Sequence, residues 1–446
     1  MTNWNSLPAE IRHAILETLA AHNTISPYAS VSTEWRSFIE KKTFAHIRLH
    51  PSCLGHLEQL DDHYQRLVKY IWLNIELKGY GCRSCRKRES PTLSYSIART
   101  LNAAITRVIS GGPGEDKFEC QLHSEDPIHD PKHGWFRGRV TEAPPDDALR
   151  RPFGLSELKF REGPEGLPSV YAVTKFVLRR QCRQQFSPGT LSYLWARLPN
   201  LREISYEPWQ SHLTIAQDHS DKGFIETVNS LPKTVQKITI FEDFNENFLE
   251  LYALGRGLLS DLNPPRVRLP KPALGAAFAI KSQKLEHISV AFMIDAGHFF
   301  DACQPDWQWP CLQSLTLTTR KIAKANAHQT NKLLIAAAQF AVNAPELKIL
   351  TLWHGERRQA CAFTYCRKDA LVSWRGTKDL RLESGTLKAW EDVAKKYAGR
   401  VLSVEKTLSM EDITSHGDAV RCLGLESVVD QVSLQQIREE NRLSWL

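Results

Sequence analysis

The chain has 446 residues, of which 42% are hydrophobic and 24% are charged. This composition excludes a collagen-like or wholly disordered chain, and the length favours two or more domains or one array of repeats. Basic residues number 57 and acidic residues 50, so the net charge is only +7. Such a weak excess does not favour a nucleic-acid-binding function, which usually needs a concentrated basic stripe.

The sequence favours an intracellular location, in the cytoplasm or the nucleus. No segment approaches the roughly 20 consecutive apolar residues of a membrane span. Pro8, Glu10 and Arg12 stand where a secretory signal peptide needs its apolar run. Ten cysteines in an intracellular chain are interpreted as thiols or metal ligands before disulfides. We therefore expect no membrane partner.

The first 45 residues predict a short helical unit. Pro8 and Glu10 are typical of a first helical turn, and apolar residues then recur every four positions from Leu7 to Leu19. Val31, Trp35 and Phe38 continue a helical pattern after Pro27. Three short helices in so few residues cannot easily bury a self-sufficient core. Part of their apolar surface must therefore be covered by the rest of the chain, by a partner, or by both.

Three blocks of this unit, residues 7–11, 15–19 and 31–36, resemble the F-box. The first reads Leu-Pro-Ala-Glu-Ile, the second Ile-Leu-Glu-Thr-Leu and the third Val-Ser-Thr-Glu-Trp-Arg, in the order usual for fungal F-box proteins. The resemblance implies a three-helix module over residues 1–45 that binds a Skp-type linker protein, and through it a cullin and a RING subunit. The residues that it assigns to linker binding or to the local core are Leu7, Pro8, Ile11, Ile15, Leu16, Val31 and Trp35.

A second pattern, apolar-x-x-apolar-x-apolar, recurs along the rest of the chain. Its last three positions alternate as in a strand, and helical patterns precede several copies. The copies are Phe44/Ile47/Leu49, Val68/Ile71/Leu73, Val173/Phe176/Leu178, Leu201/Ile204/Tyr206, Val235/Ile238/Ile240, Leu285/Ile288/Val290, Leu312/Leu315/Leu317, Leu347/Leu350/Leu352 and a degenerate Thr377/Leu380/Leu382. The pattern predicts an α/β fold, with an irregular leucine-rich-repeat-like solenoid over residues 46–427. An ordinary α/β domain is the alternative.

Two segments depart from this pattern. Residues around 110–152 are rich in Gly, Pro, Asp and His, and predict a loop-rich insertion. Residues 428–446 are polar apart from a few large apolar side chains, and predict a capping helix or a frayed tail.

The residues between the apolar positions of the repeats are expected to share one face of the sheet. Trp72, Phe241 and Trp353 lie there, and exposed aromatic residues are typical anchors of protein contacts. We therefore predict that a protein substrate binds this face. The alternative is that an added helix or loop buries these aromatic side chains.

Cys82, Cys85, Cys120 and His123 have the ligand types of a zinc site. The two pairs are far apart and the residues between them look helical, so we expect no metal. No phosphate-binding loop, His-Glu-x-x-His or Gly-x-Ser-x-Gly motif occurs, and we expect neither a catalytic residue nor a cofactor.

The sequence and the resemblance together favour a substrate-recognition adaptor of an SCF-type (Skp–cullin–F-box) E3 ubiquitin ligase, with an unknown protein substrate. The main alternative is a non-degradative scaffold with an F-box-like cap. An enzyme whose site is invisible in the sequence is a weaker third candidate.

Overall fold

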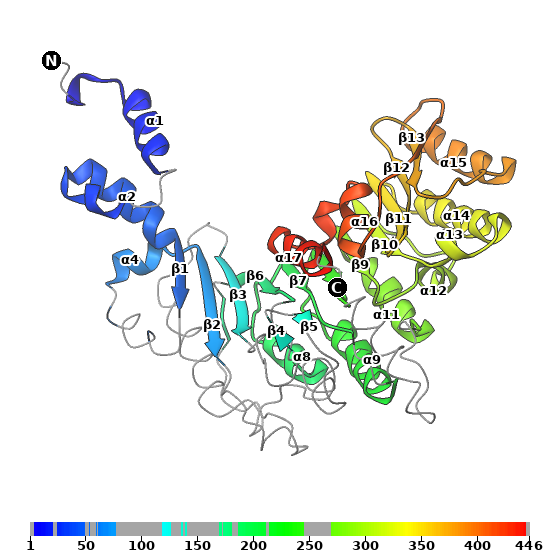
Figure 1. The fold of residues 1–446 in the computed structure, drawn as a ribbon, viewed down its shortest axis with the longest axis horizontal. Coiled ribbons are helices and arrows are strands. Elements are labelled where there is room, and N and C mark those ends of the chain that lie inside the picture. Colours follow the sequence, from blue (N-terminus) through cyan, green and yellow to red (C-terminus); the bar gives the residue numbers. More distant parts are fainter. Residues whose placement is uncertain are drawn as a thin grey trace.

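The computed structural model describes residues 4–20, 25–49, 53, 59, 61–76, 118–125, 135–136, 139–140, 169–171, 173–180, 186–210, 214–244 and 269–442. The fold is mixed α/β: helices at the N-terminus lead into a large and mostly parallel sheet (Figure 1). Among the residues that the structure describes, no helix combines the length and the apolar content needed to cross a membrane.

The N-terminal helices are η1 (Trp4–Ser6), α1 (Ala9–Ala20), η2 (Ser26–Ser30) and α2 (Thr33–Ala45). Ser32 caps α2, because its hydroxyl accepts a hydrogen bond from the backbone N–H of Trp35 at 3.3 Å. The helix α2 then continues directly into the first strand. In Figure 1 these helices stand away from the main body of the sheet.

The described residues contribute twelve strands to the main sheet, which follow one another in space in chain order. Neighbouring strands are parallel except at β11–β12 and β12–β13, which are antiparallel. The strands are β1 (His46–Leu49), β2 (Tyr70–Glu76), β3 (Phe118–Glu125), β6 (Val173–Leu178), β7 (Glu203–Tyr206), β8 (Lys237–Phe241), β9 (His287–Ala291), β10 (Ser314–Thr318), β11 (Ile349–Glu356), β12 (Gln359–Cys366), β13 (Leu371–Gly376) and β14 (Ser403–Leu408). Two short strands, β4 (Trp135–Phe136) and β5 (Arg139–Val140), pair separately.

Helices between successive strands bury the repeated apolar positions on one face. These helices are α4 (Asp62–Leu67), α8 (Pro188–Ala196), α9 (Thr214–Asn229), α11 (Pro272–Ser282), α12 (Ala296–Ala302), α13 (Lys321–Lys324), α14 (Ala327–Val342) and α15 (Ser384–Tyr397). Ile204, Ile238, Ile288, Leu315 and Leu350 pair in direct register across β7 to β11, and all belong to one continuous core.

Eight copies of the predicted apolar pattern coincide with strands, namely with β1, β2 and β6 to β11. The ninth copy, Thr377/Leu380/Leu382, is wrong: residues 377–383 follow β13 without forming a strand. Leu380 is nevertheless buried, and Leu382 packs against the same core. These leucines therefore anchor the connection to α15, which explains why they match the apolar positions of the pattern.

The opposite face of the sheet carries a second core under the C-terminal segment. This segment, called the cap here, consists of α16 (His416–Cys422), η6 (Glu426–Val428) and α17 (Gln431–Arg442). Val420 and Ile437 from the cap are buried with Phe241, Ala291 and Trp353 from the strands. The C-terminal stretch predicted as a capping helix or a tail thus forms a helix that packs on the sheet. Of the expected insertion at 110–152, the structure describes only β3, β4 and β5.

Candidate protein-interaction surfaces

The helix α1 carries two large apolar side chains that are exposed to solvent. Ile11 and Ile15 lie one turn apart on it and are 49% and 37% exposed. Pro8, just before the helix, is also exposed, and so is Val31 between η2 and α2, at 59%. Four of the predicted linker-binding residues therefore lie on the surface.

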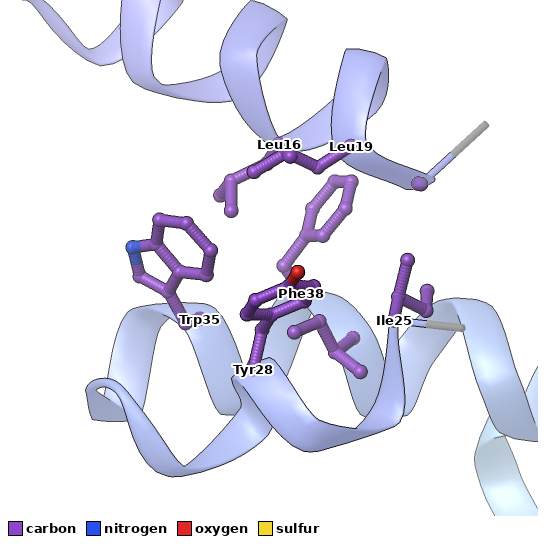
Figure 2. A pocket seen from close by; sticks show the side chains of 8 residues that line it. Leu16, Leu19, Ile25, Tyr28, Trp35 and Phe38 are labelled. Carbon is purple, nitrogen blue, oxygen red and sulfur yellow. The ribbon is translucent and has the colours of Figure 1, made fainter. Parts of the chain in front are cut away.

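The other three predicted residues contribute to the packing within the N-terminal unit. Leu16 is buried on the side of α1 that faces α2, while Leu7 and Trp35 are half-buried. Figure 2 shows Leu16 and Leu19 of α1 pointing toward the aromatic rings of η2 and α2. Between them lies a small apolar pocket. Its lining residues are Leu16, Leu19, Ala20, Ile25, Tyr28, Trp35, Phe38 and Ile39.

Polar contacts hold α1 against α2 around this pocket. Lys42 Nζ contacts Glu17 Oε2 at 2.8 Å, and hydrogen bonding to this ammonium lowers the pKa of the Glu17 carboxyl. At the other end, the indole N–H of Trp4 donates to Glu34 Oε2 at 2.8 Å, and Arg12 contacts the same carboxylate at 3.4 Å. Together with the packing of Leu16 and Leu19 against η2 and α2, these contacts orient α1 relative to α2.

Trp72, the first predicted substrate anchor, is half-buried near the N-terminal end of the sheet. Its ring lies between two guanidinium groups, those of Arg48 at 5.7 Å and Arg179 at 5.0 Å. Arg179 in turn contacts Asp430, next to α17, at 3.0 Å. Trp72 is therefore held in a charged setting that joins β2, β6 and the cap.

Phe241 and Trp353, the other two predicted anchors, are fully buried, so the prediction that they are exposed binding residues is wrong. The predicted side is correct, since both lie on the face opposite the core of the repeats. The cap covers that face. The Phe241 ring stacks 5.9 Å from His416, and the Trp353 ring meets Phe292 edge-on at 5.1 Å.

Beyond the cap, this face of the sheet is polar and falls into two rows in direct register. One row consists of the hydroxyl-bearing residues Ser205, Thr239, Ser289, Thr316 and Thr351, of which Thr351 is buried. The next row toward the start of the strands consists of Lys175, Glu203, Lys237, His287 and Ser314. Glu203 lies between two lysines, 3.7 Å from Lys175 Nζ and 4.0 Å from Lys237 Nζ. We call the two rows the polar face.

A buried ionic cluster attaches the cap to the ends of β6 and β8. Asp243 has no exposed surface and accepts hydrogen bonds from Arg180 Nε and from His416 Nε2, the latter at 2.8 Å. Burial favours the neutral acid, but the positive charge of Arg180 and the hydrogen bond from His416 outweigh it and lower the pKa of Asp243. Arg180 also lies over the Trp209 ring at 4.5 Å.

Glu207, at the end of β7, connects the sheet to α17. Its carboxylate accepts hydrogen bonds from the backbone N–H of Asp430 at 2.7 Å, from Ser433 Oγ at 2.5 Å and from the backbone N–H of Arg180 at 3.1 Å. Burial outweighs these bonds and raises the pKa of Glu207 to about 7. Sequence reasoning missed this cluster. The available signal was the acidic residues placed directly after two buried strands, Glu207 after β7 and Asp243 after β8.

The four predicted zinc ligands cannot be compared side chain by side chain, because only two of them lie in the described part of the chain. Cys82 and Cys85 lie outside the described residues, and Cys120 and His123 lie on β3, where the structure describes the backbone alone. Elsewhere in the described part of the chain, no three His, Cys, Asp or Glu side chains are grouped so that they could hold a metal ion.

Comparison with known families finds one match, to a family of unknown function, DUF6546, over residues 230–430. The matched residues begin shortly before β8 and end just before α17, so they include the hairpin β12–β13 and most of the cap. No F-box or leucine-rich-repeat family matches the chain. No curated protein matches it either.

Proposed function

We propose that this chain is a non-enzymatic adaptor of an SCF-type ubiquitin ligase. Its N-terminal helices bind a Skp-type linker, which connects it to a cullin and a RING subunit. The observation that carries the proposal is the exposed pair Ile11 and Ile15 on α1, held in a fixed direction by contacts to α2. Exposed apolar residues on a unit that stands away from the body are typical of a protein-binding surface. The F-box-like blocks of the sequence support the identity of the partner.

The body of the adaptor is then a leucine-rich-repeat-like solenoid that receives the substrate. Strands in chain order, with helices between them on one face, support this proposal. The substrate binds the polar face together with Trp72, because the cap occupies the area around Phe241 and Trp353. Holding a substrate near a charged conjugating enzyme accelerates transfer by proximity, and the chain needs no catalytic residue for this.

The test is co-purification of a Skp-type linker and its cullin with the full chain. The double variant Ile11→Asp/Ile15→Asp places two charges on the proposed interface, and we expect it to abolish linker binding. Ile280→Asp/Val432→Asp is the control, because it also replaces two exposed aliphatic side chains by aspartate, at positions on α11 and α17. We expect this control to retain the linker.

Thermal unfolding of both double variants should stay close to that of the native chain, since all four side chains are exposed. Retention of the linker by Ile11→Asp/Ile15→Asp would disprove the proposed interface. If the linker co-purifies without any cullin, the proposed role as a ligase adaptor would be wrong and a scaffold role would be favoured.

A further inference from the structure

The last strand of the sheet, β14, has one edge without a neighbour among the described residues. It ends the strand order and pairs only with β13. All six of its residues are exposed, and the two aliphatic ones, Val404 and Leu408, are 43% and 55% exposed. An exposed edge of this kind is a template for pairing with another strand, and proteins usually blunt such edges.

The backbone groups on this edge can be assigned from the register. Ser403 donates its backbone N–H to Ala370 and Ser409 donates to Gly376, each at 2.8 Å, so the odd-numbered residues face β13. In a parallel ladder the residues between them point their N–H and C=O groups the other way. The groups of Val404, Lys406 and Leu408 therefore face outward along the open edge.

Val404, Lys406 and Leu408 lie on the same face of the sheet as the core of the repeats. Val404 pairs with Val372 and Lys406 with Trp374, and both partners are buried against the helices on that side of the sheet. Val404 and Leu408 thus extend an apolar face that stops at the last strand. A further strand with apolar residues opposite these two would cover them.

A second copy of the chain fits this edge poorly. Two copies would pair antiparallel about a two-fold axis, so that the residue at the axis faces itself. In the two registers with the greatest overlap of β14 with its copy, this residue is Glu405 or Lys406. Like charges directly opposite each other on neighbouring strands destabilise the pairing.

We infer that β14 binds an extended segment of a different protein, which adds to the sheet as an antiparallel strand. Its recognition pattern is apolar-x-x-basic-apolar: the apolar residues cover Leu408 and Val404, and the basic residue lies opposite Glu405. Lys406 already pairs with a carboxylate, since its Nζ lies 3.3 Å from Asp379 Oδ1. Glu405 therefore determines which charge the bound segment should carry. This inference goes beyond the proposed function and does not depend on it, because it rests on β14 alone.

The probe is a fluorescent peptide, acetyl-Thr-Val-Thr-Thr-Lys-Val-Thr-amide, titrated with the full chain. A second peptide carries Glu in place of Lys. We expect saturable binding of the first peptide, and a preference over the second of about two- to fivefold, the range that one cross-strand charge pair supports. In Glu405→Lys the preference should reverse, while Glu391→Lys, an exposed charge change on α15, should leave it as in the native chain.

Val404→Pro removes an N–H that faces the open edge and leaves the hydrogen bonds to β13 in place, and proline is tolerated at such edge positions. We expect it to weaken peptide binding by about tenfold or more. If Val404→Pro fails to fold, the reversed peptide preference expected for Glu405→Lys still tests the inference. No saturable binding by the native chain, or no reversal, would overturn the inference. A native chain that sediments as a dimer and becomes monomeric in Val404→Pro would overturn the choice of a different protein as the occupant.

Discussion

Trp353 and Leu352 are neighbours on β11 whose side chains enter two different cores. Leu352 is buried among the helices of the repeats, and Trp353 is buried under the cap. The strand alternates strictly, so adjacent side chains must point to opposite faces. Because both faces are covered at this point, both side chains lose all contact with solvent.

This burial predicts that Trp353→Ala destabilises the protein as strongly as a core substitution does. We expect the free energy of unfolding to fall by about 3–5 kcal/mol for Trp353→Ala and about 2–5 kcal/mol for Leu352→Ala. Denaturant unfolding measures both values. Val401→Ala, at an exposed position before β14, is the control and should change the value by less than about 0.5 kcal/mol. An unchanged stability for Trp353→Ala would mean that the cap does not cover it in solution.

The side on which Trp353 lies could be predicted from the sequence, but its burial could not. Period-two alternation depends on adjacent residues, so Leu350 and Leu352 are enough to assign the faces. Whether that face is covered depends on residues that are distant in the sequence. His416 of the cap, for example, is hydrogen-bonded to Asp243, which lies 173 positions earlier in the chain. No local pattern carries that information. For this reason the prediction assigned Phe241 and Trp353 to the correct face of the sheet but took them to be exposed.

At the scale of elements, the repeated strands could be predicted because each carries the same apolar pattern against its own helix. The hairpin β12–β13 was missed, since Ala362, Phe363 and Tyr365 are all buried and hide the alternation. A continuous apolar run of this kind does not separate a buried strand from a buried helix. The helices of the N-terminal unit could be predicted from the sequence, and four of the seven residues assigned to linker binding lie on the surface. Whether they bind a linker stays a prediction.

The attachment of the cap through Glu207 predicts a pH dependence of stability. The folded-state pKa of Glu207, about 7, lies above its usual value of 4.5, so the native state holds this proton more tightly than the unfolded chain. Its contribution to stability is therefore complete below about pH 4.5 and is lost as the pH rises through about 7. The lowered pKa of Asp243 has the opposite effect. Its contribution to stability is present above the usual pKa of 3.8 and is lost as the pH falls below that value.

We expect the free energy of unfolding to decline between pH 5 and pH 8 in the native chain, and to decline less in Glu207→Gln, which cannot ionise. Urea unfolding at intervals of one pH unit measures both slopes. Glu203→Gln is the matched control, since this glutamate lies at the other end of the same strand on the polar face and is partly exposed. The control should keep the native slope. Identical slopes in the native chain and in Glu207→Gln would contradict the assignment.

At the scale of the whole molecule, the strand order separates the proposed linker-binding surface from the open edge of β14. The N-terminal helices lead into β1 at one end of the sheet, and β14 lies at the other end. Neighbouring strands lie about 4.8 Å apart, so twelve strands place these ends roughly 50 Å from each other along the sheet. Charges separated by more than about 8 Å of solvent are largely screened at physiological ionic strength.

Two surfaces this far apart, with no shared residue, should bind independently. We expect the affinity of the Skp-type linker to be the same with and without saturating edge peptide, within about twofold, because the free energies of distant sites usually add. Isothermal titration of the linker into the chain, alone and with the peptide bound, measures the difference. The combined variant Ile11→Asp/Ile15→Asp/Val404→Pro should lose both activities, and each parent variant should lose one. A linker affinity that changes tenfold or more on peptide binding would show that the sheet transmits a coupling free energy of about 1.4 kcal/mol between its ends, and the two surfaces would then act as one site.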